Sequence, residues 1–582
     1  MAVSAGVVGF HEAASILGRE WASAGKFGEF QCASGPGPSV TFGRGAALTR
    51  SDIFGNASLS SVSVRSQSSS RSEACGSQSS RKRSALCAIA DRLAKDFGGT
   101  EESSRVSTES DSADAKVNYN WEEQWYPLYL TREVPKDAPL GLTVFDRNLV
   151  VFYDGDGKLN CLEDRCPHRA AKLSEGQLMD GRLECLYHGW QFQGDGSCTK
   201  IPQLAPGAKI PKQACARSYA LKESQGVLWV WMADHRSAPY DKVPYFDHYD
   251  VEGYAEFGGV HVLPYDYSVL LENLMDPAHI PISHDRSDGP RSRRELAEAM
   301  VFNITERSDE GFAGNWHLVS TPEVMNFTRF SAPGVAYTEQ KKVLPDGVQL
   351  RFSATILCRP AGQGSAMLII RFGNSRADGK TASWLMTRVP RWYLHMRASV
   401  IFEQDMAFLS SQNEVLVREG KPTKDLYLNL KSQDVFVEEY RKWLDKVGHG
   451  MPYYYGHRTF SPAPVSAVQE ASPAGLSASA SSTHPAKGAF GHRYARDPTN
   501  RYFRHVVHCK ACRTALRNFQ AGQKAALVVA ALSAGLAAVL SKPASRAAFV
   551  ALAFLMAAVH WACSRGVAAL TENWFRPHKA TL

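Results

Sequence analysis

Two short segments each place a cysteine and a histidine close together. Cys166 and His168 are separated only by Pro167, and two residues separate Cys185 from His188. Sixteen residues lie between His168 and Cys185. A thiolate and an imidazole from each of two facing loops would supply four ligands. The pattern therefore predicts a metal centre with two sulfur and two nitrogen ligands.

Three interpretations of these four residues compete. A Cys₂His₂ zinc site uses the same ligands, but it normally groups cysteine with cysteine and histidine with histidine, whereas here they alternate. A Rieske [2Fe-2S] centre needs two thiolates on one iron and two imidazoles on the other, which one cysteine and one histidine from each loop deliver. Unrelated buried residues would need four coincidences of spacing. The spacing favours the Rieske cluster.

A second group of metal-ligand residues follows further along the chain. Asp276, His279 and His284 form the pattern Asp-X2-His-X4-His. Two imidazoles and one carboxylate on one face of Fe(II) are the facial triad of non-haem oxygenases, which leaves positions for O₂ and substrate. We expect the carboxylate to come from a distant segment, with Asp405 as the candidate and Glu403 as the alternative. The sequence thus predicts a mononuclear iron held by His279, His284 and Asp405.

Local patterns predict the elements that position both groups. Strands are expected over 149–153 and 158–162, because they flank the turn-forming tetrapeptide at 154–157 directly before the first Cys-His loop. Asp405 lies in a stretch whose apolar residues recur at helical spacing, so a half-buried helix is expected there. A lone aspartate buried on such a helix needs a partner, and iron is a reasonable one.

The segment around the two iron histidines is expected to bend. If Asp276 caps a helix with Pro277 at its first position, Asp276 and His279 project from one face. Pro281 would then break the helix and turn His284 back towards the same metal. The simplest alternative to a functional role for Asp276 is that it serves only as a helix N-cap.

The net charge of +8 is carried by the two ends of the chain. Residues 1–90 carry +4 and residues 501–582 carry +10, which leaves −6 on the stretch between them. The basic pI of 8.8 therefore does not describe the body of the protein. We predict no nucleic-acid partner, because binding needs a basic face on the folded part.

The N-terminal 90 residues contain 19 serines, scattered arginines and few acids, without a sustained apolar period. A segment of this composition buries too little apolar surface to offset the conformational entropy that it would lose on folding. We therefore expect it to be disordered. Serine-rich, arginine-bearing and acid-poor leaders are typical of organelle transit peptides, which predicts a chloroplast transit peptide over residues 1–90. A disordered tail of a cytosolic protein is the alternative.

Two charge-free stretches near the C-terminus, 525–541 and 547–564, predict a pair of transmembrane helices. Basic residues precede the first stretch, so the bulk of the chain is expected on the cytoplasm-like side, which in a plastid is the stroma. A buried alanine-rich helical pair is the alternative. A linker rich in Pro, Ala and Ser is expected over 461–490, and a basic segment over 501–520.

With both metal motifs in place, the chain resembles the Rieske-type non-haem iron oxygenases, and within them the plant group of pheophorbide a oxygenase. The resemblance extends over about 118–570. It is carried by the stretches 265–284, 402–415 and 501–509, by the paired C-terminal apolar stretches, and by the Cys-X2-Cys motif just before them. The translocon-associated branch of this group, at the inner chloroplast envelope, looks most similar.

The resemblance implies an α+β fold. An all-β Rieske [2Fe-2S] domain is expected over 118–238, followed over 240–460 by a helix-grip domain, an antiparallel sheet plus helices, that holds the mononuclear iron. A C-terminal two-helix membrane anchor completes the chain.

The resemblance also implies roles for single residues and partners. Asp276 would be an electron-transfer bridge between a cluster histidine of one subunit and an iron histidine of the next, in a homotrimer, and Asn273 would belong to the same catalytic group. The sequence holds no flavin, nicotinamide or plant-type ferredoxin fingerprint, so the electrons are expected from reduced ferredoxin.

The motif Cys509-X2-Cys512 admits three roles. Beside basic Lys510 it is predicted to be a regulatory dithiol, with thioredoxin as the partner. Alternatively, His505 and His508 complete a zinc site with the two cysteines. Two free structural thiols are the third possibility.

The function that these features imply is hydroxylation of a chlorophyll-derived open-chain tetrapyrrole, a phyllobilin, at the inner envelope. Two alternatives share much of the evidence. The chain could be a redox-sensing subunit of the protein import translocon, or it could oxidise pheophorbide a with the same metal ligands. An intact iron triad favours an oxygenase, since a sensor has no need of an open iron site.

Overall fold

The computed structural model describes residues 117, 119–287, 293–344, 347–379, 388–462 and 499–573, all of which belong to one compact unit. The expected transit peptide at 1–90 and almost all of the expected linker at 461–490 lie outside these residues.

The first region of the described chain is all-β. Six antiparallel strands form a sheet in the order β1-β10-β9-β4-β3-β2. β1 and β10, which lie at one end of this order, are buried throughout. The strands are β1 (Trp125–Leu130), β2 (Leu140–Val144), β3 (Arg147–Tyr153), β4 (Leu159–Glu163), β9 (Ser218–Ser224) and β10 (Val227–Trp231).

A second, four-stranded sheet in the order β5-β6-β7-β8 is inserted between β4 and β9. Its strands are β5 (Gln177–Met179), β6 (Arg182–Cys185), β7 (Trp190–Phe192) and β8 (Cys198–Lys200). The predicted hairpin is confirmed, because β3 pairs with β4 from Tyr153 opposite Leu159. The first Cys-His pair therefore follows the end of β4, and the second occupies the end of β6 and the turn before β7.

Seven antiparallel strands form the large sheet of the next region, in the order β11-β17-β16-β15-β14-β13-β12. The long central strands β16 and β17 are almost wholly buried, which makes them the core of the region. The strands are β11 (Ala255–Leu263), β12 (Met300–Ser308), β13 (Gly311–Leu318), β14 (Thr321–Ser331), β15 (Val335–Val343), β16 (Gln349–Gly362) and β17 (Ser365–Arg376).

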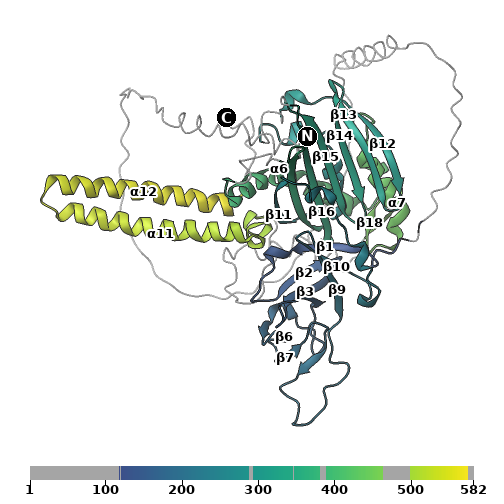
Figure 1. The fold of residues 1–582 in the computed structure, drawn as a ribbon, viewed down its shortest axis with the longest axis horizontal. Helices are drawn as coiled ribbons and strands as arrows, with labels where there is room; N and C mark the ends of the chain where they lie inside the picture. Colours follow the sequence, from purple (N-terminus) through teal and green to yellow (C-terminus); the bar gives the residue numbers. More distant parts are fainter. Residues whose placement is uncertain are drawn as a thin grey trace, which may run out of the picture. The chain divides into compact units, whose positions relative to one another are not determined.

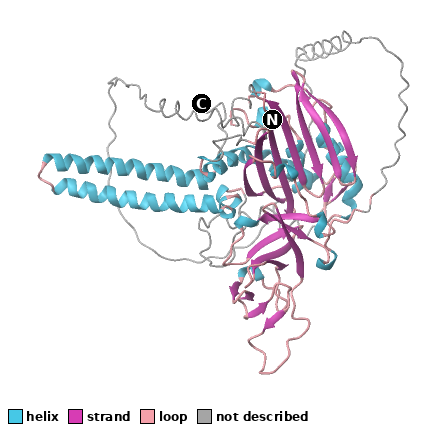
Figure 2. Cartoon of the chain, in the orientation of Figure 1, coloured by secondary structure: helices cyan, strands magenta, loops and turns pink. Residues whose placement is uncertain are grey.

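Helices α3 (Tyr267–Met275), α6 (Arg391–Glu419) and α7 (Val435–Val447) contact this sheet. In Figure 2, helices lie against its strands. Helix α6 begins after Pro390 and ends at Gly420, which adopts the left-handed conformation that favours glycine at this position. Helix α3 contacts both the sheet and α6. These contacts fix the position at which the segment after α3 begins. The α+β fold expected from the sequence is confirmed.

The expected helix cap at Asp276 is wrong. Asp276 follows the last residue of α3, and a four-residue helix, α4 (Ile280–Ser283), begins only after His279. Pro281 lies in the first turn of α4 and does not break a helix, because the first turn leaves its N–H groups unpaired and tolerates proline. The Asp276 carboxylate instead accepts a hydrogen bond from the Ala278 N–H at 2.7 Å.

The C-terminal region begins with α10 (Arg501–Arg504) and continues into two long helices, α11 (Lys510–Val539) and α12 (Pro543–Thr571). These run side by side as a hairpin (Figure 1). Both are long and apolar enough to cross a membrane, and they extend well beyond the two predicted stretches. The helices pack closely at Gly566, where an added Cβ would lie 2.7 Å from the Phe519 ring.

Candidate metal centres

The first centre comprises the two predicted Cys-His pairs, which the fold brings together at one end of the four-stranded sheet. The thiols of Cys166 and Cys185 hydrogen-bond to each other, and the rings of His168 and His188 lie 4.4 Å apart between centroids. The cysteines are buried, whereas His168 is exposed and His188 half-buried. Sulfur thus gathers on the inner side of the centre and nitrogen on the outer side.

The surroundings of the two sulfurs suit a negatively charged cluster. The backbone N–H groups of His168 and Arg169 point at the Cys166 sulfur, and those of Tyr187 and His188 point at the Cys185 sulfur. The hydrogen bond between the two thiols lowers the pKa of Cys185 and raises the pKa of Cys166, because the pair shares one proton. A thiolate is the ligand form of cysteine. The four residues therefore fit a [2Fe-2S] cluster with its histidine side at the surface.

The second centre comprises His279, His284 and Asp405, whose ligand atoms all lie within 4.8 Å of one another. Asp405 Oδ2 is 3.2 Å from His284 Nε2 and 3.7 Å from His279 Nε2. Three ligands on one face of an octahedral metal with bonds of roughly 2.1 Å lie about 3 Å apart, so the set fits one ion. The histidines come from the two ends of α4, and Asp405 comes from the middle of α6.

Neighbouring polar side chains orient the two histidines. His284 Nδ1 lies 2.8 Å from Gln404 Oε1, and Gln404 in turn donates to Ser287 Oγ. His279 Nδ1 lies 3.4 Å from Asp276 Oδ2. Both Nδ1 atoms therefore face an oxygen acceptor, at hydrogen-bond geometry for His284 only, and both Nε2 atoms face Asp405 as candidate metal-binding lone pairs. Asn273 Nδ2 approaches His279 Nε2 at 3.4 Å, so this predicted residue also lies at the centre.

A cavity of about 100 Å³ opens at this second centre. Its walls come from α3, α6 and the sheet, and apolar side chains dominate them. A small polar group lies among these, in which Gln340 donates to Asn326 at 2.8 Å and the Trp316 indole donates to Thr328 at 3.3 Å. The metal ligands thus face a largely apolar chamber with a few hydrogen-bonding groups, as small-molecule sites commonly do.

Glu403, the alternative carboxylate, faces another way. It pairs with Arg501 at 2.5 Å and with Arg504, and all three side chains are buried. Both arginines belong to α10, so this ion pair joins α6 to the C-terminal region two residues away from Asp405.

Sequence reasoning missed three kinds of residue. Gln404 is adjacent to Asp405, and only its contact with His284 reveals its role. The polar group around Asn326 lies on strands whose sequence carries no motif. His395 joins Cys509, Cys512 and His505 in a further cluster of metal-ligand atoms, although nothing in its local sequence marks it.

Comparison with known proteins agrees with this architecture. The family model described as Rieske [2Fe-2S] domain matches residues 124–220, and the model of pheophorbide a oxygenase matches residues 330–423. Protein TIC 55 of Pisum sativum is 50% identical over 86% of this chain and 91% of its own length. Protein TIC 55 of Arabidopsis thaliana is 51% identical over 80% and 85%, respectively.

A more distant relative extends the likeness. Pheophorbide a oxygenase of Oryza sativa subsp. japonica is 27% identical over 72% of this chain and 77% of its own length. All three relatives are named as chloroplastic. The chain carries a Rieske [2Fe-2S] cluster and a mononuclear iron, and it belongs to the TIC 55 family of chloroplast Rieske oxygenases.

Proposed function

We propose that this protein hydroxylates a chlorophyll-derived open-chain tetrapyrrole, a phyllobilin, with O₂ and electrons from reduced ferredoxin. The observation that carries the proposal is the set of His279, His284 and Asp405 at the wall of a mostly apolar cavity. A metal with three protein ligands on one face keeps open positions for O₂ beside a bound substrate. A redox sensor would need neither the open positions nor the chamber.

The ligand assignments follow from the two centres. Cys166, His168, Cys185 and His188 would hold the [2Fe-2S] cluster, and His279, His284 and Asp405 would hold the iron. When bound, the cluster supplies single electrons and the iron activates O₂ for insertion of one oxygen atom into a C–H bond.

The chain's own residues perform the remaining tasks. Gln404 and Asp276 fix the orientation of the two imidazoles through their Nδ1 atoms. The apolar walls exclude water from the reacting carbon and bind the pyrrole rings through burial of their surface. Thr328 lies among these walls, and its hydroxyl, which accepts from the Trp316 indole, can donate a hydrogen bond to a substrate carbonyl.

Electrons would arrive from a neighbouring copy of the chain in a homotrimer. The cluster histidines are at the surface, and a surface cleft elsewhere is lined by Asp276, His279 and Asp405. Exposed Leu428 also lines this cleft, with 87% of its area accessible, which favours contact with another protein surface. Asp276 would then connect the partner's cluster histidine to His279.

The hairpin of α11 and α12 would anchor the enzyme in the inner chloroplast envelope with its folded body in the stroma. Apolar side chains such as Leu532, Val539, Phe554 and Trp561 are largely exposed along the hairpin, which suits contact with lipid. The import translocon is a further partner that we propose for this location.

Pheophorbide a oxidation is the second candidate function. The family model of pheophorbide a oxygenase covers the segment with Asp405, so the same iron site serves either substrate. The shape of the cavity would separate a closed macrocycle from a flexible open chain.

The test uses the full-length protein with ferredoxin, its reductase and O₂. Phyllobilins and pheophorbide a are offered separately, and products are scored by a mass gain of one oxygen. We expect oxygenation of the phyllobilin, its loss in His279→Ala and its retention in His235→Ala, which changes an exposed histidine outside both centres. Turnover of pheophorbide a alone would support the second candidate, and no turnover of any tetrapyrrole would contradict both.

A further inference from the structure

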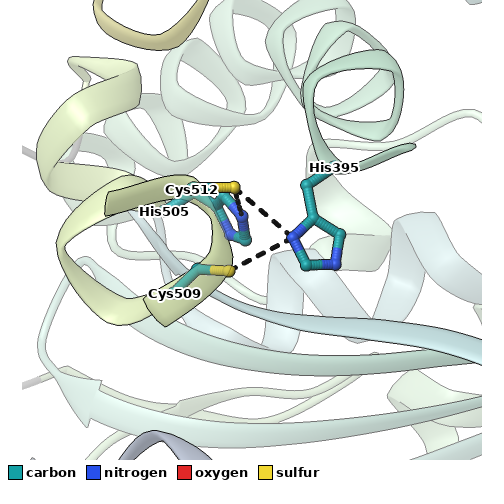
Figure 3. Close-up of side chains that lie close together, drawn as sticks. All are labelled: His395, His505, Cys509 and Cys512. Atoms are coloured by element: carbon teal, nitrogen blue, oxygen red, sulfur yellow. Dashed lines mark hydrogen bonds between the residues drawn. The ribbon is translucent and has the colours of Figure 1, made fainter. Parts of the chain in front are cut away.

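Four metal-ligand side chains outside both iron centres lie close together at the start of α11 (Figure 3). Cys509 precedes the first residue of α11, and Cys512 lies in its first turn. His505 follows α10, and His395 extends from α6. Three segments thus contribute to one cluster: helix α6, the residues that follow α10, and the start of α11.

The distances in this cluster match a tetrahedral ion. His395 Nδ1 lies 3.3 Å from Cys509 Sγ and 3.5 Å from Cys512 Sγ, and His505 Nε2 lies 3.4 Å from Cys512 Sγ. Zinc bonds of about 2.3 Å to sulfur and 2.0–2.1 Å to nitrogen at tetrahedral angles put neighbouring ligands about 3.6 Å apart. All four ligand atoms lie within 4.8 Å of one another.

The hydrogen bonding of His505 prepares it as a ligand. Its Nδ1 lies 2.8 Å from the carbonyl oxygen of Val260, so Nδ1 carries the proton and donates it. Its Nε2 therefore presents a lone pair to Cys512. This is the arrangement in which an outer acceptor fixes the tautomer of a metal-bound histidine.

Burial distinguishes this cluster from a reactive dithiol. His395, His505, Cys509 and Cys512 are each at most 4% exposed. Two sulfurs converge on a single nitrogen of His395, and one proton on that nitrogen could not satisfy both fully. A cation at the centre would satisfy all four groups at once.

We propose that His395, His505, Cys509 and Cys512 bind one zinc ion, as a structural site separate from the two iron centres. Four protein ligands complete a tetrahedral shell and leave no open position, which is the arrangement of structural rather than catalytic zinc. Two thiolates and two imidazoles in a tetrahedron select zinc among the common divalent metals.

The zinc would fasten the membrane hairpin to the iron-binding domain. His395 and Asp405 lie on the same helix, ten residues apart, and the cysteines start the first hairpin helix. The ion pair of Glu403 with Arg501 and Arg504 joins the same two regions. The site thus fixes the position of α11 relative to the helix that carries an iron ligand.

His508 is excluded from the site, although the sequence allows it as a ligand. Its Nδ1 lies 3.0 Å from the Tyr129 hydroxyl of β1 and not near the two sulfurs. Since His508 is as buried as His505 and lies three residues away, it provides a matched control.

The test is the metal content of the full-length holoenzyme, purified in detergent, by elemental analysis and zinc-edge X-ray absorption. We expect about one zinc per chain, with about two sulfur neighbours near 2.3 Å and two nitrogen neighbours near 2.0 Å. The zinc should be lost in His395→Ala and in Cys512→Ser and retained in His508→Ala. The absorption of the [2Fe-2S] cluster should persist in all three variants, which shows that the Rieske region folds.

Other results would overturn the proposal. Wild-type protein with no more zinc than Cys512→Ser would exclude the site. A disulfide between Cys509 and Cys512 in freshly isolated protein, found by mass spectrometry, would support the thioredoxin-dependent dithiol instead. Loss of zinc in His508→Ala, with retention in His395→Ala, would refute the ligand set.

Discussion

The described part of the chain holds two sets of two cysteines and two histidines, and their surroundings differ. In the set on the four-stranded sheet the cysteines are buried while His168 is exposed. In the set beneath the hairpin all four side chains are buried, and they come from α6, α11 and the segment before it. The first set suits electron transfer at a surface, and the second suits the fastening of chain segments. Cysteine and histidine ligands thus suit different roles, depending on how exposed the side chains are and which elements carry them.

Cys185→Ser gives the largest expected effect and tests whether the two sets are independent. Loss of a thiolate ligand should remove the cluster, its two irons and its absorption, and turnover should fall to background because no electrons reach the second centre. Zinc content, measured by elemental analysis, should stay at the wild-type value. Loss of zinc together with the cluster would break the comparison.

Glu403→Gln tests the surroundings of the buried set. It removes the charge of a carboxylate that pairs with Arg501 and Arg504, and it leaves all four ligands unchanged. The variant leaves the buried guanidinium groups of Arg501 and Arg504 without their carboxylate, so we expect a loss of about 3–5 kcal/mol in the free energy of unfolding. Chemical denaturation in detergent measures it.

Glu414→Gln is the control for this measurement. Glu414 pairs with Arg418 on the same helix at 3.7 Å, and both side chains are exposed. We expect a change within about 0.5 kcal/mol. Equal losses in both variants would show that burial of the Glu403 ion pair does not matter.

Asp276→Asn tests whether the exposed set delivers electrons through this carboxylate. The amide keeps the shape but removes the charge opposite His279 Nδ1, and we expect turnover to fall about 10- to 100-fold. Iron and zinc contents should be unchanged. Turnover with chemically prereduced protein and turnover with ferredoxin should be compared, because an unaltered rate in both would exclude a role in electron transfer.

Gln404→Ala gives the smallest expected effect. His284 would lose its orienting acceptor, and we expect iron affinity at the second centre to fall about tenfold. Iron retention against a chelator measures this. The zinc site is on the same helix but nine residues away, so its occupancy serves as the internal control.

The sequence predicted those features in which the ligands are local. Cys166 with His168, Cys185 with His188, and His279 with His284 each lie within a few residues of one another, so spacing alone indicated the chemistry. The hairpin before the first loop was predictable because Asp and Gly residues at 154–157 determine the turn.

Several features that depend on tertiary packing were not predictable, although the distant Asp405 was predicted from the helical spacing around it. Asp276 carries the sequence signal of a helix cap, but α3 continues to Met275 because its apolar residues pack on the sheet and on α6. His395 is a single histidine on a long helix, and only the fold brings it to Cys509. The sequence does not distinguish His505 from His508 as a ligand. In the structure, His508 contacts Tyr129 instead of the two cysteines.

The buried ion pair of Glu403 sets a limit on protein engineering. A soluble version shortened to end at residue 500 would lack both Arg501 and Arg504, and would retain a buried carboxylate two residues from Asp405. Such a carboxylate would draw in water or a proton and disturb the helix that orients the iron. Truncations meant to improve solubility should therefore cut within α11, after Leu516, and not before α10.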